Sequence, residues 1–331
     1  MRLSRAALTR EASATGFQQE PLEKAARLLE LLEGFRAHPF LKDRLALKGG
    51  TALNLFLFDV PRLSVDIDLN YVGSANRAVM LSERPKVENA IAAVCGRSNV
   101  AVRKVPTEHA GGKWRLGYTS VSGRQANLEL DVNFLLRTPL WPPLALRSRP
   151  LGSFLARDTP VLDLHELAGG KLAAMFDRSA SRDLFDVRNL LQHAGIVEER
   201  LRIAFVVYGG MSRRDWRNVT VDDVNADPSE VGRQLVPVLR EGLAPAAQEV
   251  GAWTRELVAG CRQLVGALLP LRANEREFLD ALNGRGEVVP ELVTADADLQ
   301  QVLRSHPPLL WKAHNVRLHL GITNETKPNA R

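Results

Sequence analysis

One short segment restricts the fold of this 331-residue chain more than any other. In residues 64–69 (SVDIDL), apolar side chains alternate with Asp66 and Asp68. Alternation of this kind is typical of a β-strand that is buried on one face. Side chains two positions apart share a face of a strand, so the two carboxylates point the same way, about 7 Å apart. The segment therefore predicts a half-buried strand that carries a fixed pair of carboxylates.

The paired carboxylates indicate a bound cation. Carboxylates held side by side repel each other unless a positive charge lies between them. Mg²⁺ suits such a pair, because it binds one or two carboxylates, keeps waters and takes phosphate oxygens as further ligands. We therefore predict Asp66 and Asp68 as ligands of Mg²⁺ or Mn²⁺. The bare pattern favours a simpler alternative, an edge strand with a solvated acidic face, and the surrounding residues reverse that preference.

A glycine pair precedes this strand. Between a predicted strand and a predicted helix lies the run Lys48-Gly49-Gly50-Thr51. Two glycines at a helix N-terminus let backbone N–H groups approach an anion closely. The Thr51 hydroxyl can donate to the anion or cap the helix, and Lys48 adds a positive charge. A plain left-handed turn is the alternative for the glycine pair alone.

A third carboxylate is predicted on another strand. Alternation within residues 126–134 places Glu129, Asp131 and Asn133 on one face. A carboxylate on a neighbouring strand would complete a metal cluster or act as the base that takes a proton from a hydroxyl group. The alternative is the polar face that any antiparallel sheet presents. It weighs more against Glu129 than against Asp131.

Two helices in the second half of the chain carry further charges. Asp163 is a plausible N-cap of the first, and Lys171 lies at the edge of that helix's apolar stripe. Lys171 either extends to solvent or reaches into a site that requires a cation. In the second helix, Asp183 and Asp186 are i, i+3 neighbours, and Arg182 and Asp186 form an i, i+4 pair. An internal ion-pair cluster is the alternative there.

The remaining pattern predicts an α/β first half and a helical second half. A proline-rich loop over residues 139–160 separates the halves, so we place the domain boundary there and predict domains at residues 1–158 and 159–331. The predicted strands are residues 44–48, 64–69, 100–105, 113–120 and 126–134. The predicted helices include one that starts at Pro21 and residues 51–58, 83–94, 162–177 and 182–193.

Composition excludes several classes of protein. No apolar stretch reaches 18 residues, so we expect no transmembrane helix, and the N-terminus lacks the apolar core of a secretory signal. Cys95 and Cys261 are the only cysteines, which excludes a disulfide scaffold and a cysteine-based zinc module, and we expect a reducing cytoplasm. The net charge of +6 permits an anionic partner. Neither a P-loop nor a G-x-S-x-G motif is present.

Four motifs together resemble a known family. KGGTAL, RLSVDIDL, the lysine-bearing helix and RDLFDVRNLL follow one another between about residues 48 and 190. The set resembles the AbiEii/AbiGii nucleotidyltransferase toxins, which belong to the DNA polymerase-β-like nucleotidyltransferase superfamily and include the mycobacterial MenT toxins. The resemblance implies an α+β fold, with a mixed sheet flanked by helices and then an all-helical C-terminal domain. Residues 195–331 match none of the motifs.

The resemblance also implies roles for individual residues. Gly49, Gly50 and Thr51 match the phosphate-holding motif, and Lys171 matches a lysine that contacts the nucleotide phosphates. Asp131 matches only the third carboxylate of the broader superfamily. The implied catalytic residues are Asp66, Asp68, Asp131, Lys171 and Asp186, of which Asp66 and Asp68 bind the metal. The implied nucleotide-binding residues are Lys48, Gly49, Gly50, Thr51, Arg62, Ser64 and Asp183.

The implied activity is in-line transfer of an NMP from an NTP, with either Asp131 or Asp186 acting on the acceptor hydroxyl. The resemblance further implies a toxin that modifies RNA, at the tRNA 3′ end in the best-known relatives, blocks translation and growth, and has a cognate antitoxin. The arginines of residues 212–218 (SRRDWRN) slightly favour an RNA acceptor, and a solvated turn is their alternative. Three other hypotheses are nucleotidylation of a protein or small molecule, a non-catalytic nucleotide-binding module and, on position alone, a metal-independent autokinase-like activity on Ser64.

Overall fold

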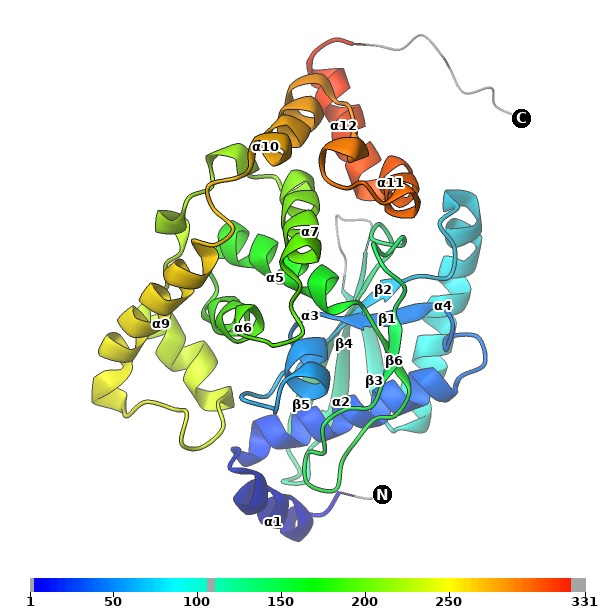
Figure 1. Cartoon of the computed structure of the whole chain (residues 1–331). Coiled ribbons are helices and arrows are strands. Elements are labelled where there is room, and N and C mark those ends of the chain that lie inside the picture. Colours follow the sequence, from blue (N-terminus) through cyan, green and yellow to red (C-terminus); the bar gives the residue numbers. More distant parts are fainter. Residues whose placement is uncertain (1–2, 106–110, 323–331) are drawn as a thin grey trace.

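The computed structural model describes residues 3–105 and 111–322, and its centre is a mixed seven-stranded sheet (Figure 1). The strand order is β3-β4-β5-β2-β1-β7-β6. The strands are β1 (Leu45–Lys48), β2 (Asp66–Tyr71), β3 (Ala101–Val105), β4 (Gly112–Thr119), β5 (Gln125–Asn133), β6 (Leu144–Leu146) and β7 (Thr159–Val161). β2 is central, antiparallel to β1 and parallel to β5. The five strands predicted from the sequence are all present, displaced by two residues at most.

The alternation along β2 has the predicted consequence. Ile67 and Leu69 are buried in the hydrophobic core, whereas Asp66 and Asp68 are partly exposed on the other face. The same two-residue period holds along β4 and β5, where Trp114 and Leu130 are among the buried members. The sheet therefore has one apolar face and one face that carries the predicted carboxylates.

Helices from the N-terminal half cover the apolar face of the sheet. α2 (Gln19–Ala37) and α4 (Arg77–Arg97) pack on its strands, and α1 (Arg5–Thr15) packs on α2. The Arg27 guanidinium of α2 lies over the Tyr118 ring of β4, which places α2 on the side opposite the carboxylates. α4 begins six residues earlier than predicted, because the Asn76 side chain accepts the N–H groups of Ala78 and Val79 and caps the helix there.

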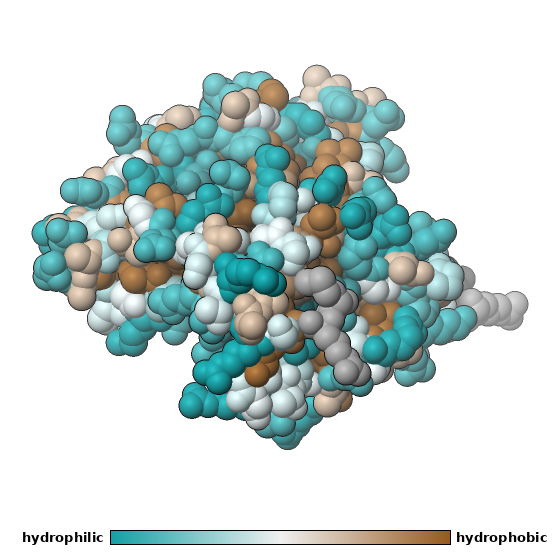
Figure 2. Space-filling view, turned by 90° about the horizontal axis from the view of Figure 1, so that it is seen from below, coloured by the Kyte–Doolittle hydropathy of each residue, from teal (hydrophilic) through white to brown (hydrophobic). Residues whose placement is uncertain are grey.

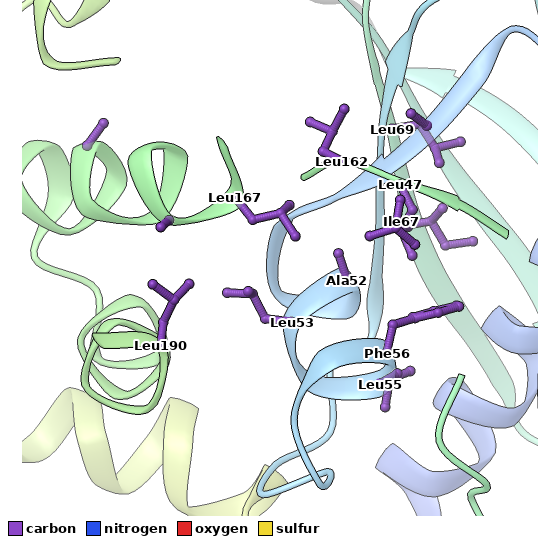
Figure 3. Packing of buried hydrophobic residues seen from close by; sticks show 14 of the residues in the cluster. Leu47, Ala52, Leu53, Leu55, Phe56, Ile67, Leu69, Leu162, Leu167 and Leu190 are labelled. Carbon is purple, nitrogen blue, oxygen red and sulfur yellow. The ribbon is translucent and has the colours of Figure 1, made fainter. Parts of the chain in front are cut away.

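Helices from the second half lie against the other side of β1 and β2. α3 (Gly49–Ala52) continues as the π-helix η1 (Leu53–Leu57), and α5 (Leu164–Arg178) and α6 (Ser181–Leu191) pack against this segment. Figure 3 shows Leu167 of α5 and Leu190 of α6 close to Leu53. The hydrophobic core is therefore continuous from the sheet into the helical half.

The rest of the chain is almost entirely helical. The longer helices are α7 (Glu198–Met211), α9 (Val250–Val265), α10 (Ala273–Asp280), α11 (Ala297–Arg304) and α12 (Pro307–His319). The short ones are η2 (Trp216–Asn218), η3 (Val221–Asp223), α8 (Pro228–Glu230), η4 (Val231–Leu235), η5 (Val236–Val238), η6 (Ala247–Glu249), η7 (Ala281–Arg285) and η8 (Pro290–Leu292). In the part of the chain that the structure describes, no helix is long and apolar enough to cross a bilayer. Figure 2 shows a surface that is mostly hydrophilic on the side seen from below.

The prediction of a plain loop over residues 139–160 is wrong. β6 and the start of β7 lie in that range, and β7 pairs with β1 in parallel and with β6 in antiparallel orientation. Each strand has only three residues, and β7 joins the sheet through β1, which is distant in the chain, so the local sequence gives little sign of either strand. The sheet thus runs past residue 158, while the division into two domains stays a prediction.

Candidate active site

The predicted carboxylates lie in two rows that cross the sheet. Asp68 of β2 is paired in register with Asp131 of β5 on one side and with Lys48 of β1 on the other. Asp66 is paired in the same way with Glu129. Because residues that pair directly across strands share a face, all of these side chains lie on the open face of the sheet. The carboxylates are therefore brought together by strand pairing, as predicted.

The surroundings of Asp66 and Asp131 disfavour the ionised form of each carboxylate. Burial raises the pKa of Asp66, and Asp68 and Glu129 raise it further, although Arg182 opposes them. Burial, with Asp68 and Glu129, likewise raises the pKa of Asp131. Burial is the main cause of both raised pKa values and the neighbouring carboxylates add to it, so a bound cation would stabilise the ionised forms.

The donor set suits a hard divalent ion. Glu129 is already engaged, because its carboxylate lies 2.7 Å from Lys113 Nζ. Within the described residues, no group of three or more His, Cys, Asp or Glu side chains could hold a metal by itself. Two carboxylates from β2 would thus need water and substrate oxygens as further ligands, which is the coordination that Mg²⁺ prefers.

The glycine pair makes room for this arrangement. Gly49 has φ +72°, and a Cβ added to it would overlap the Asp68 carboxylate. A Cβ on Gly50 would lie 2.7 Å from Arg62 Nη2 and 3.1 Å from Ser64 Oγ. The Thr51 hydroxyl does not face the cleft, because it donates a 2.6 Å hydrogen bond to the Asp66 carbonyl oxygen. Thr51 therefore ties α3 to β2, while the glycines keep the space beside the aspartates open.

Asp186 lies in a fully buried ion pair. Its carboxylate accepts hydrogen bonds from Arg62 Nε at 2.8 Å and Arg62 Nη2 at 2.6 Å, and from Asn54 Nδ2 at 2.9 Å. Lys171 Nζ lies 2.9 Å away. Burial disfavours the charged form, but Arg62 and Lys171 hold the pKa of Asp186 below its usual value. With every oxygen engaged and no exposed surface, Asp186 can position Arg62 and Lys171 but cannot reach a substrate hydroxyl.

Lys171 is also engaged. Its ammonium lies 2.7 Å from Asp183 Oδ1 as well as near Asp186. Burial opposes the charge, yet these two carboxylates raise the pKa of Lys171. Asp183 also accepts from Arg178 Nε at 2.6 Å, and Lys171 and Arg178 outweigh burial to lower the pKa of Asp183 to about 2. The internal ion-pair cluster considered for these residues is therefore present.

The expected i, i+4 pair between Arg182 and Asp186 is absent from the described ion pairs. Arg182 instead points to the cleft, where its Nη1 lies 3.7 Å from Asp66 Oδ2. The reason is that Asp186 turns inward to Arg62. Arg182 joins Arg178 as a cation that the sequence reasoning missed, and the side chain of Arg178 is 64% exposed. The position of Arg178 two turns after Lys171 on one helix is the signal that could have found it.

Two cavities meet at Asp68, Lys171 and Arg178, which line both. The first, of about 400 Å³, is polar and contains the residues around Asp66, Asp131 and Arg182. The second, of about 410 Å³, extends beyond Gly49, and its more apolar walls are Leu136, Leu162, Leu167, Ala173, Ala174 and Tyr208. The site can thus hold a ligand with a charged part and a flat apolar part. A further cavity of about 600 Å³ lies under α2, on the other face of the sheet.

Two of the three arginines of residues 212–218 are paired with carboxylates, whereas Arg213 is exposed and has no ion pair among the described residues. Arg214 forms an ion pair with Asp223 at 2.5 Å, and Arg217 pairs with Asp215 at 2.7 Å and with Asp280. These contacts hold the turn after α7 in place, and a turn is the alternative to RNA binding that the sequence analysis gives for this segment. Asp163, by contrast, caps α5 as predicted, because its side chain accepts the His165 N–H.

A glycine turn at a helix start lies beside two strands that bear four carboxylates, which is the arrangement that the resemblance to nucleotidyltransferases of mixed α+β fold leads us to expect. A family model described as "Nucleotidyl transferase AbiEii toxin, Type IV TA system" matches residues 30–281. The chain belongs to this family of toxin–antitoxin nucleotidyltransferases. The family, the fold class and the class of enzyme predicted from the sequence are confirmed.

Solved structures agree with the fold. MenT4, a nucleotidyltransferase toxin from Mycobacterium tuberculosis H37Rv, matches with a TM-score of 0.63 and 21% identity, over 92% of this chain and 100% of that chain. The CdnC:HORMA-deltaN complex of E. coli MS115-1 matches with a TM-score of 0.25 and 14% identity, over 92% of this chain and 97% of that chain, and supports no argument. No curated protein matches.

Proposed function

We propose that this chain transfers an NMP from an NTP to the 3′ end of an RNA, with tRNA as the acceptor, and thereby blocks translation and growth. The observation that carries the proposal is the register of Asp68 with Asp131 beside the Gly49–Gly50 turn. Its setting is the cytoplasm, where NTPs and tRNA occur, and its partner in the cell is a cognate antitoxin.

Asp66 and Asp68 are the residues that would hold Mg²⁺ or Mn²⁺. When bound there, such an ion would neutralise negative charge on the triphosphate. The first backbone N–H groups of α3 have no partner within the helix, and Gly50 and Gly49 line the polar and the more apolar cavity, so these groups suit the phosphates. Arg178 and Arg182 add positive charge where pyrophosphate leaves. The more apolar cavity beyond Gly49 has room for the nucleobase.

Of the two candidate bases, Asp131 is the one that fits. Its carboxylate lines the polar cavity, and burial raises its pKa above the usual value, which makes it a stronger proton acceptor than a solvated aspartate. The acceptor oxygen forms a bond to the α-phosphorus, the bond to the bridging oxygen breaks, and the hydroxyl proton passes to Asp131. Asp186, Asp183 and Arg62 then act as positioning residues, and Lys171 contributes its charge from their network.

The experiment incubates the purified chain with total tRNA, Mg²⁺ and each α-³²P-labelled NTP in turn, beside an Asp66→Ala variant. We expect label in the tRNA band with the intact chain and none with the variant. Label that persists in the variant would contradict the proposed role of Asp66. No label with any NTP would contradict the RNA acceptor, and cell lysate would then test protein and small-molecule acceptors. Failure to bind Mg-NTP would favour a non-catalytic module.

A further inference from the structure

The outer part of the sheet leaves its carboxylate-bearing face open to solvent. Along β3, β4 and β5, the exposed positions on this face include Arg103, Arg115 and Asn127. The alternate residues of β4 and β5 point to the opposite face and are buried under the N-terminal helices, among them Trp114, Leu116 and Leu128. A polar surface three strands wide therefore begins at the active-site cleft and ends at the edge strand β3.

Strand register connects this surface to the site. Arg103 pairs with Arg115, Arg115 pairs with Glu129, and Glu129 pairs with Asp66. In the next row, Lys113 pairs with Asp131. Positive charge thus starts directly beside the carboxylates and continues outward. The span from β5 to β3 is two strand spacings, about 10 Å.

The two outer arginines form an uncompensated pair. Like charges directly opposite each other on neighbouring strands are destabilising. Neither Arg103 nor Arg115 has an ion-pair partner within residues 3–105 and 111–322, whereas the third cation of this surface, Lys113, is paired with Glu129. Two guanidinium groups that repel each other and face solvent are complementary to an anion with regularly spaced charges.

We propose that Arg103 and Arg115, with Asn127 beside them, form a platform that binds the phosphate backbone of the single-stranded 3′ segment of the acceptor RNA. This inference rests on the proposed function. The guanidinium fork matches phosphate oxygens bidentately. Ala101 and Gly117, which pair in the adjacent row, keep the surface low enough for a backbone to lie on it. The 3′ hydroxyl would then reach Asp131, one or two nucleotides from the arginines.

The platform lacks the means to read sequence. None of the positions that face the cleft side along the described parts of β3, β4 and β5 is aromatic, so no base can stack there. Contacts to phosphates position a nucleic acid without distinguishing its bases. We therefore expect the platform to contribute affinity and salt dependence, equally for RNAs of different sequence.

The test compares Arg103→Ala/Arg115→Ala with a control, Arg97→Ala/Arg255→Ala. The control removes the same charge from exposed arginines on α4 and α9 that have no ion pair in the described structure. Binding of a 5′-labelled short single-stranded RNA and of total tRNA is measured over a range of salt concentrations. We expect about tenfold weaker binding for the platform variant, from roughly threefold per phosphate contact. The slope of log K against log salt should fall by about 1.4, and the control should resemble wild type.

In the transfer assay, we expect the platform variant to raise KM for RNA and to leave KM for the NTP unchanged. Equal RNA affinity in the platform variant and wild type, or an equal loss in the control, would overturn the inference. A lower Tm of the platform variant would also overturn the inference, because removal of the like-charge contact should leave Tm equal or higher. If the platform variant still binds RNA but no longer binds a polyglutamate peptide, the surface is a docking face for an acidic protein instead.

A failure of the proposed function can be distinguished from a failure of the platform. If the wild-type chain transfers no NMP to any RNA, the acceptor is wrong, while the binding measurement, which requires no chemistry, still decides whether the arginines hold RNA. If wild type labels RNA and the platform variant does so with the same KM for RNA, only the platform is wrong.

Discussion

Asp66 lies where a carboxylate destabilises the folded chain in the absence of a cation. Burial and two neighbouring carboxylates raise its pKa, so its negative charge opposes folding at neutral pH. We expect Asp66→Asn to leave Tm unchanged or higher and to lower NMP transfer about a thousandfold, the effect of losing several kcal/mol of metal-assisted stabilisation. Thermal denaturation and the labelled-tRNA assay measure the two effects. Asp43→Asn, on the exposed turn before β1, serves as control, and a lower Tm with intact transfer would assign Asp66 a structural role.

Gly49 offers a second test at the scale of one residue. An alanine there meets both a left-handed backbone, φ +72°, and the Asp68 carboxylate. We expect Gly49→Ala to displace Asp68 and lower transfer about 100-fold, since a misplacement of about 1 Å can have that effect. Gly123→Ala is the matched control, because Gly123 has φ +81° and nothing within 4 Å of its added Cβ. An equal loss of transfer in the two variants would show that backbone strain alone lowers the activity.

Between elements, one buried ion pair holds the site together. The bidentate pair of Arg62 and Asp186 connects the segment before β2 to α6, and Asn54 and Lys171 join η1 and α5 to it. Removing one partner leaves an unpaired buried charge, which costs about 3–5 kcal/mol. We therefore expect Asp186→Ala to lower the free energy of unfolding by that amount in urea denaturation.

The control for this measurement is an exposed ion pair. Lys104 pairs with Glu88 at 2.7 Å on the surface, and the Lys104 side chain is 54% exposed. Lys104→Ala should change the free energy of unfolding by less than about 1 kcal/mol. If Asp186→Ala retained full stability but lost transfer, Asp186 would act in catalysis after all.

At the scale of the whole molecule, Glu166 joins the sheet to the helical half. From α5 it accepts hydrogen bonds from the Tyr208 hydroxyl of α7 at 3.0 Å and from the Leu140 N–H after β5 at 2.9 Å. Burial raises the pKa of Glu166 to about 8, in spite of these donors. The folded state therefore keeps a proton that the unfolded chain loses near pH 4.5.

The stability that this proton contributes is fully present below about pH 4.5 and is lost as pH rises through about 8, at up to about 1.4 kcal/mol per pH unit. We expect Glu166→Gln to reduce this loss in unfolding measurements between about pH 5 and 9. Glu256→Gln, exposed on α9, should keep the wild-type profile. An unchanged profile in Glu166→Gln would mean that the group is ionised throughout.

The extent to which sequence predicts structure differs among these elements. The two-residue period of β2, β4 and β5 and the Asp163 cap of α5 depend on neighbouring residues, so they could be predicted from the chain. The Asn76 cap of α4 is equally local, but the predicted start of that helix is six residues too late. The three-residue strand β7 pairs with β1 at Leu47 and Val161, 114 residues apart in the chain (161 − 47), and β6 pairs with β7. Neither strand can be predicted from its local sequence. The partner of Asp186, 124 residues before it, is likewise a product of packing.

The sequence by itself determined the pair of aspartates on a half-buried strand, the glycine turn, the third carboxylate and the family, because each depends on residue type and short spacing. Only the tertiary structure decided that Asp186 is buried while Asp131 lines the cleft, and that Arg178 and Arg182 face the aspartates. It also decided that Arg103 and Arg115 lie in strand register with the aspartates, without an ion-pair partner among the described residues. The physical reason is that strand pairing and helix packing choose which distant charges meet, and a charge acts through the neighbours it meets.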